Sequence, residues 1–129
     1  NIIVRNATVW LCNDNDTVVT NGSLWVRHGK IVGAGRISIP ELPDALVIDA
    51  HGLHLTPGLI DCHSHTAILG SVNESTLPST AMVRISDVVN SETDNLHKQL
   101  AGGVTIVDLL HGSANAIGGQ NCVIKLRDG

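Results

Sequence analysis

The stretch PGLIDCHSH, residues 57–65, decides the fold that the sequence predicts. Its apolar run GLI favours a short buried β-strand. Asp61, His63 and His65 follow at alternate positions, and side chains at i, i+2 and i+4 of an extended strand share one face. Two imidazoles on one face can chelate a single divalent metal ion. Asp61 is then a candidate to orient a ligand histidine or to ligate the metal itself.

His111 is a second candidate on the same rim of the predicted sheet. It follows VTIVDLL, residues 104–110, whose β-branched residues predict another buried strand. Sites in parallel α/β folds gather at the carboxyl ends of strands, where His63, His65 and His111 all fall. His111 is therefore a candidate for contact with a substrate or a metal-bound water. The alternative is that all three are surface histidines at strand ends. Asp108 is expected to face the helix layer instead.

A helix is predicted between these two strands. Ser91 is the expected N-cap, with Asp94 three residues on as a weak capping box. Leu96 and Leu100 lie on one helix face, and the glycines at 102–103 end the helix. Strand, helix and strand make a β-α-β unit, which implies parallel strands joined by a right-handed crossover.

Residues 1–56 predict a different, β-rich unit. Short β-branched runs alternate with turns such as NDNDT, and SLWVRHGKIVGAG, residues 23–35, reads as a hairpin with HGK at its tip. ISIPELPD, residues 37–44, carries two prolines and is expected to be a loop. Two more short strands follow around Gly52. The whole is expected to be a small antiparallel unit.

Two loops of the second part are unusual. CHSHTAILGSVNESTLPSTAMVR, residues 62–84, is long and irregular, and such a loop inside a compact domain is usually functional. HGSANAIGGQ, residues 111–120, lacks the Gly-Lys-Ser/Thr of a phosphate loop. Its glycines still allow the backbone to approach another part of the protein closely.

Composition excludes several classes of protein. The formal net charge is −4 and no Lys/Arg cluster occurs, which argues against nucleic-acid binding. No apolar run reaches the roughly 18 residues that a membrane helix needs. Three widely spaced cysteines do not make a disulfide framework. Without a signal peptide in the given chain, a cytoplasmic location is favoured.

Four segments together resemble a known family. NATVW, GKIVGAG, VIDAHGLHLTPGLIDCHSH and LAGGVTIVDLLHGSA, in that order, resemble the opening of the metal-dependent amidohydrolase superfamily, and its imidazolonepropionase-like members most of all. HGSANAIGGQ also resembles a loop of some bacterial amidohydrolases. The resemblance implies that residues 1–56 form part of a composite β-sandwich. Residues 57–129 would be the first strands and helix of a (β/α)8 TIM barrel, left incomplete.

The resemblance also implies the chemistry. His63 and His65 would hold a divalent metal ion, with zinc expected before other metals, and Asp61 would support them. The complete enzyme would contain one or two such ions. The enzyme would hydrolyse C–N bonds of amides or cyclic amides in a small-molecule substrate. Deaminase, dipeptidase and imidazolonepropionase-like activities stay open.

The remaining ligands and the catalytic base are expected beyond Gly129. The isolated chain is therefore expected to be inactive and to need the rest of the same polypeptide, and homo-oligomer formation stays open. The rival interpretation is a complete, non-catalytic β-rich binding or structural module with incidental histidines.

Overall fold

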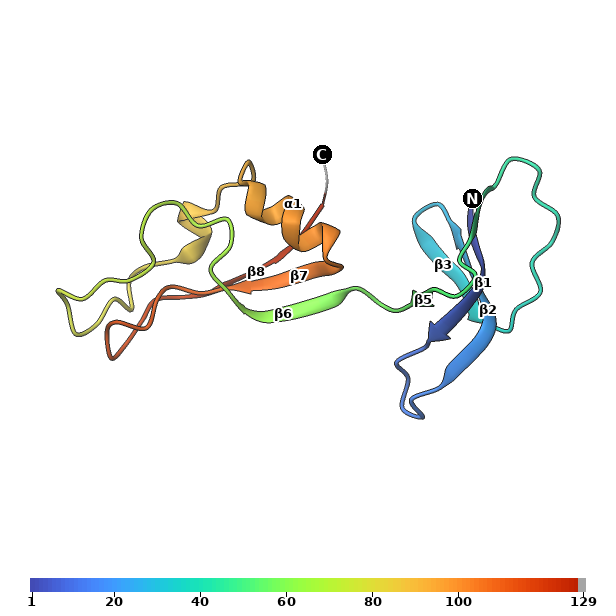
Figure 1. Cartoon of the computed structure of the whole chain (residues 1–129). Helices are drawn as coiled ribbons and strands as arrows, with labels where there is room; N and C mark the ends of the chain where they lie inside the picture. Colours follow the sequence, from blue (N-terminus) through green and yellow to red (C-terminus); the bar gives the residue numbers. More distant parts are fainter. Residues whose placement is uncertain (128–129) are drawn as a thin grey trace. The chain divides into compact units, whose positions relative to one another are not determined.

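The computed structural model describes residues 1–127 and divides the chain into two compact units. The first comprises Asn1–Pro57 and the second begins at Gly58. Each has a sheet of its own, and strands outweigh helices in both (Figure 1). Among residues 1–127, no helix has the length and apolar character needed to cross a membrane.

The first unit is one sheet in which β3, β2, β1 and β4 are neighbours in that order and β5 also pairs with β1. β1, β2 and β3 are antiparallel, as predicted, whereas β4 and β5 run parallel to β1. The prediction of a wholly antiparallel unit was therefore wrong. The proline-containing loop forms, as expected, and it is long enough to carry the chain back before β4 starts. The strands are β1 (Ile2–Trp10), β2 (Val18–Arg27), β3 (Lys30–Gly35), β4 (Leu46–Asp49) and β5 (His54–Leu55).

The hairpin between β2 and β3 forms as the sequence predicts. His28 and Gly29 make its two-residue turn, and both have positive φ, 50° and 70°. Positive φ at both central residues is the geometry whose twist matches that of paired strands. Ala7 and Val9 of β1 form a small buried core with Ala50.

The second unit contains the predicted β-α-β arrangement. β6 (Leu59–Ser64) and β7 (Val104–Leu109) are parallel and joined through η1 (Ile85–Val88) and α1 (Asp94–Ala101). The final strand-like piece is β8 (Cys122–Lys125), which pairs antiparallel with β7. The described sheet thus has the order β6-β7-β8.

The helix begins later than predicted. Its N-cap is Thr93, and no side-chain hydrogen bond caps it. The Asn90 side chain accepts a hydrogen bond from the Glu92 backbone N–H at 3.0 Å, so Ser91 lies inside a turn stabilised by Asn90. The predicted Ser91 capping box was therefore wrong. The helix end is confirmed, since Gly102 is the C-cap and its N–H bonds to the Lys98 carbonyl.

The core of the second unit lies under α1. Val107 and Leu109 of β7 are fully buried, and Leu96 and Leu100 of the helix pack against them, as their spacing predicts. Because side chains alternate along a strand, Asp108 lies on the other face of the sheet. There its carboxylate accepts hydrogen bonds from Asn121 at 2.7 and 2.8 Å. The prediction that Asp108 faces the helix layer was wrong.

β6 is not the buried strand that the sequence predicts. Leu59 is 57% exposed and Ile60 is 68% exposed. β6 stands at the edge of the described sheet, with β7 on one side only. An apolar strand is buried only when other elements cover its faces and edges. The apolar composition of β6 therefore could not determine how exposed its side chains are.

Candidate functional site

The strand register changes at the start of the candidate site. Asp61 pairs with Val107 and Ser64 pairs with Leu109. Between these two pairs β6 advances by three residues while β7 advances by two, so β6 has one extra residue. This bulge breaks the alternation. Since Val107 and Leu109 both face the core, Asp61 and Ser64 share that side. The predicted common face of Asp61 with the two histidines is therefore wrong.

His63 and His65 do lie next to each other. Their ring centroids are 5.3 Å apart and the ring planes are perpendicular, at 89°. Both side chains are exposed. The Asp61 carboxylate accepts the backbone N–H of His63 at 3.1 Å, so it holds the chain at the bulge and bonds to no imidazole nitrogen of His63 in this arrangement.

A hydrogen bond fixes the tautomer of a neutral His65 ring. Its Nδ1 lies 2.7 Å from the Leu110 carbonyl oxygen. A carbonyl can only accept, so Nδ1 carries a proton, and in the neutral imidazole the lone pair is then on Nε2. This is how a metal-binding histidine is usually oriented, with a backbone carbonyl behind it. The Leu110 N–H in turn donates to the Ser64 carbonyl at 2.9 Å, which ties the two strand ends together.

His111 follows Leu110 directly but its ring has other contacts. Its Nδ1 bonds to the Gly112 carbonyl, and the ring stands against Gly118 so closely that a Cβ there would overlap it. The half-buried ring lines a cavity of about 370 Å³, which we call the loop cavity. The structure thus brings His63 and His65 together and gives His111 a different place on the same rim.

The loop cavity lies between two loops that pair along their backbones. The Thr80 N–H donates to the Ile117 carbonyl at 2.8 Å, and the Gln120 N–H donates to the Val83 carbonyl at 2.8 Å. A Cβ on Gly119 would overlap the Val83 backbone. The sequence predicts that the glycines of residues 111–120 let the backbone approach another part of the protein closely. That other part is the loop of residues 71–84. That partner could not be read from the sequence.

Glu74 supplies charge to the loop cavity. The Thr76 hydroxyl and then the Thr76 backbone N–H hydrogen-bond its carboxylate, and these bonds hold the pKa of Glu74 below its usual range. Glu74 is therefore ionised at neutral pH.

A complete metal centre is not found in the part of the chain that the structure describes. There, no group of three or more His, Cys, Asp or Glu side chains could hold a metal ion. Two imidazoles alone can supply at most two of the four donors that a tetrahedral metal site takes. The catalytic base expected beyond Gly129 lies outside the described residues.

Comparisons with known proteins show that the chain is similar to amidohydrolases. No protein-family model matches the chain. The crystal structure of an amidohydrolase from Thermotoga maritima MSB8 superposes with a TM-score of 0.81 and 36% identity, covering 99% of this chain and 34% of that one. Amidohydrolase tasK of Hapsidospora irregularis is 30% identical over 147 aligned residues, 95% of this chain and 15% of that protein.

A shorter match links the chain to a second name. The imidazolonepropionase of Geobacillus kaustophilus is 43% identical over 60 residues, 42% of this chain and 14% of that protein. The chain thus spans about a third or less of the length of each protein described here.

Proposed function

Because this chain belongs to the amidohydrolase superfamily, we propose that it is the N-terminal part of a metal-dependent hydrolase of C–N bonds. The substrates would be small molecules with amide or cyclic amide groups. The likeness to the Thermotoga maritima amidohydrolase over 99% of the chain supports the class of reaction. The match to an imidazolonepropionase supports cyclic amides as the substrate type.

The observation that carries the metal site is the hydrogen bond from His65 to the Leu110 carbonyl. It leaves Nε2 of His65 as a lone-pair donor beside the ring of His63. We infer that these two imidazoles hold one divalent ion, zinc before others, because nitrogen ligands in a tetrahedral set suit that metal. When bound, the ion supplies Lewis acidity for hydrolysis.

The parallel pairing of β6 with β7 across α1 supports a barrel as the setting of this site. In (β/α)8 barrels, active sites lie at the carboxyl ends of the strands. His65 and Leu110 meet at that end of the two strands. Further ligands, a second metal ion and the catalytic base would come from later residues, so the 129-residue chain alone should not turn over substrate.

Histidine side-chain NMR tests the metal site without an activity assay. Long-range ¹H–¹⁵N spectra of the metal-free chain should show the Nδ1–H tautomer for His65. On addition of Zn²⁺, the nitrogens of His63 and His65 should shift together. His51 is the matched control, since it lies in a turn of the first unit and should not respond.

Two results would contradict the proposal. One is an Nε2–H tautomer at His65, because the ligand nitrogen would then be blocked. The other is a Zn²⁺ response that is the same at His51 as at His63 and His65. A hydrolysis assay on hydantoin, a cyclic amide, should find the chain inactive. Zinc-dependent turnover that is lost in His63→Ala would show that the chain alone is sufficient for hydrolysis.

A further inference from the structure

The loop cavity has the size and rigidity of a small-molecule site. Its volume of about 370 Å³ falls within the range of roughly 300–1,000 Å³ typical of ligand pockets. The backbone pairing of the two loops fixes its walls, with isolated bridges at Ser79 with Ile117 and at Arg84 with Gln120. It is therefore a preformed hollow rather than a gap between free loops.

Hydrogen-bond acceptors are available on its lining. The Asn115 Nδ2 donates to Thr80 Oγ1 at 2.8 Å, which sets the orientation of the Asn115 amide. The carbonyl oxygen of Asn115 therefore keeps its lone pairs for another donor. Thr80 itself is buried, with 6% of its surface exposed, so this pair is a fixed part of the wall.

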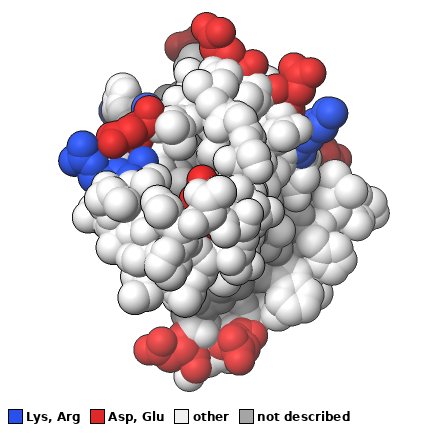
Figure 2. Space-filling model, turned by 90° about the vertical axis from the view of Figure 1, so that its left-hand side faces the viewer, with Lys and Arg blue, Asp and Glu red and all other residues white. Residues whose placement is uncertain are grey.

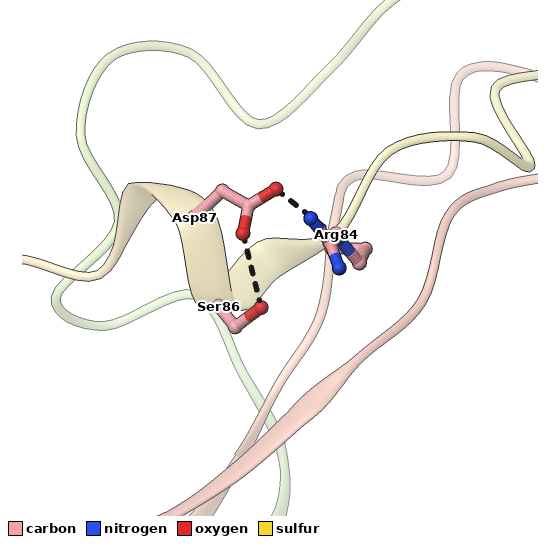
Figure 3. A network of polar contacts seen from close by, with 3 residues as sticks. All are labelled: Arg84, Ser86 and Asp87. Carbon is pink, nitrogen blue, oxygen red and sulfur yellow. Dashed lines mark hydrogen bonds and ion pairs between the residues drawn. The ribbon is translucent and has the colours of Figure 1, made fainter.

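The charge of the loop cavity is negative. Glu74 lines it and is the one acidic residue within residues 65–84 and 110–121, while Arg84 is the one basic residue there. Arg84 is engaged elsewhere, since its Nε lies 3.3 Å from the Asp87 carboxylate, which also accepts the Ser86 hydroxyl (Figure 3). Most of the surface in the view of Figure 2 carries neither Lys or Arg nor Asp or Glu.

Apolar side chains complete the lining. Leu77 and Met82 both border the cavity, and they are 47% and 73% exposed. A lining that is mostly apolar with a few polar groups is typical of small-molecule sites. They would cover an alkyl stem and leave the charged end of a ligand to Glu74.

We propose that the loop cavity binds small molecules that join a cationic N–H group to a short alkyl stem. Acceptors on Glu74 and Asn115 receive the N–H group, and Leu77 with Met82 covers the stem. The loop that carries Asn115 starts at Leu110, whose carbonyl holds His65. The cavity is therefore the pocket for the part of the substrate remote from the reacting bond, a role that rests on the proposed hydrolase function.

The test is a titration of the ¹⁵N-labelled, metal-free chain with n-butylguanidinium. Neutral n-butylurea and anionic pentanoate serve as probes of similar length. We expect n-butylguanidinium to shift amides of residues 71–83 and 111–115 and to bind at least tenfold more tightly than n-butylurea. Glu74→Gln should lower its affinity about tenfold, because charge-assisted hydrogen bonds are roughly twice as strong as neutral ones.

The variants separate charge from structure. Gln at position 74 can still accept the Thr76 N–H, so the local turn is kept while the charge is lost. Glu92→Gln, an exposed residue of the same unit that does not line the loop cavity, is the matched control and should bind like the wild type.

Three results overturn the proposal: no shifts in these residues, equal affinity for n-butylurea, or unchanged affinity in Glu74→Gln. The proposed metal site is judged separately, by the Zn²⁺ response of His63 and His65. If that response is absent while n-butylguanidinium still binds, the metal site fails and the cavity stands as a binding site. If zinc binds and the probe does not, the cavity proposal fails alone.

Discussion

Replacing Leu109 by alanine should destabilise the second unit much more than the same change at Leu59. Leu109 is completely buried at the centre of the core, while Leu59 is 57% exposed at the sheet edge. The change removes three carbons, which at about 0.8 kcal/mol per buried CH₂ is a loss of about 2.4 kcal/mol. The cavity left behind raises the cost of Leu109→Ala to about 3–5 kcal/mol. Leu59→Ala leaves no enclosed cavity and should cost about 1 kcal/mol.

The assay must report on the right unit. The chain has no Tyr or Phe, and Trp10 and Trp25 both belong to the first unit, so tryptophan fluorescence does not follow the second. Amide hydrogen exchange along β7, together with far-UV circular dichroism in urea, measures the free energy of unfolding that matters here. Equal losses of protection in Leu109→Ala and Leu59→Ala would refute the described core and its register.

Three further predictions concern local geometry and charge. Gly58→Ala places a Cβ 2.8 Å from the Thr105 Cβ, so β7 must shift and amide exchange should report a loss of about 1–3 kcal/mol; unchanged exchange would count against this contact. The hydrogen bond from the Asn6 amide lowers the pKa of Asp49 in the folded protein. The Asp49 carboxylate therefore stabilises the fold above the pKa that it has in the unfolded chain, and this stabilisation is lost as the pH falls through its pKa in the folded protein. Asn6→Gly, which keeps the positive φ, should raise the pKa of Asp49 in an NMR titration, and an unmoved pKa would reject the bond. His65→Gln should abolish the paired Zn²⁺ response at His63, and a full response would argue against chelation.

Local rules predicted the local elements well. The turn at His28 and Gly29 needs positive φ at two positions, and the sequence supplies a glycine at one of them. Leu96 and Leu100 identified the side of α1 that packs on the core, since a spacing of four residues places both on one side of a helix. These features depend on neighbours in the sequence, so the sequence alone carries them.

The failures depend on contacts between distant segments. Asp61 was assigned to the face of the histidines by strict alternation, and the bulge opposite β7 cancels that alternation. Asp108 was assigned to the wrong face because the sequence does not show which side of β7 packs against α1. The exposure of β6 depends on which strands flank it, which no local pattern determines.

The candidate site was predicted in part. The nearness of the two imidazoles follows from their spacing of two residues. The bond from His65 to Leu110 joins positions 45 residues apart, and the loop cavity joins positions around 80 to those around 115, so neither could be read from the sequence.

We infer that His63 and His65 together supply half of the donors of a metal centre. Calorimetric titration of Zn²⁺ into the wild-type chain and into His63→Ala, His65→Ala and His51→Ala tests it most directly. We expect one zinc ion per wild-type chain, the same binding in His51→Ala, and loss of that binding in both other variants. Wild-type affinity in either His63→Ala or His65→Ala would contradict it.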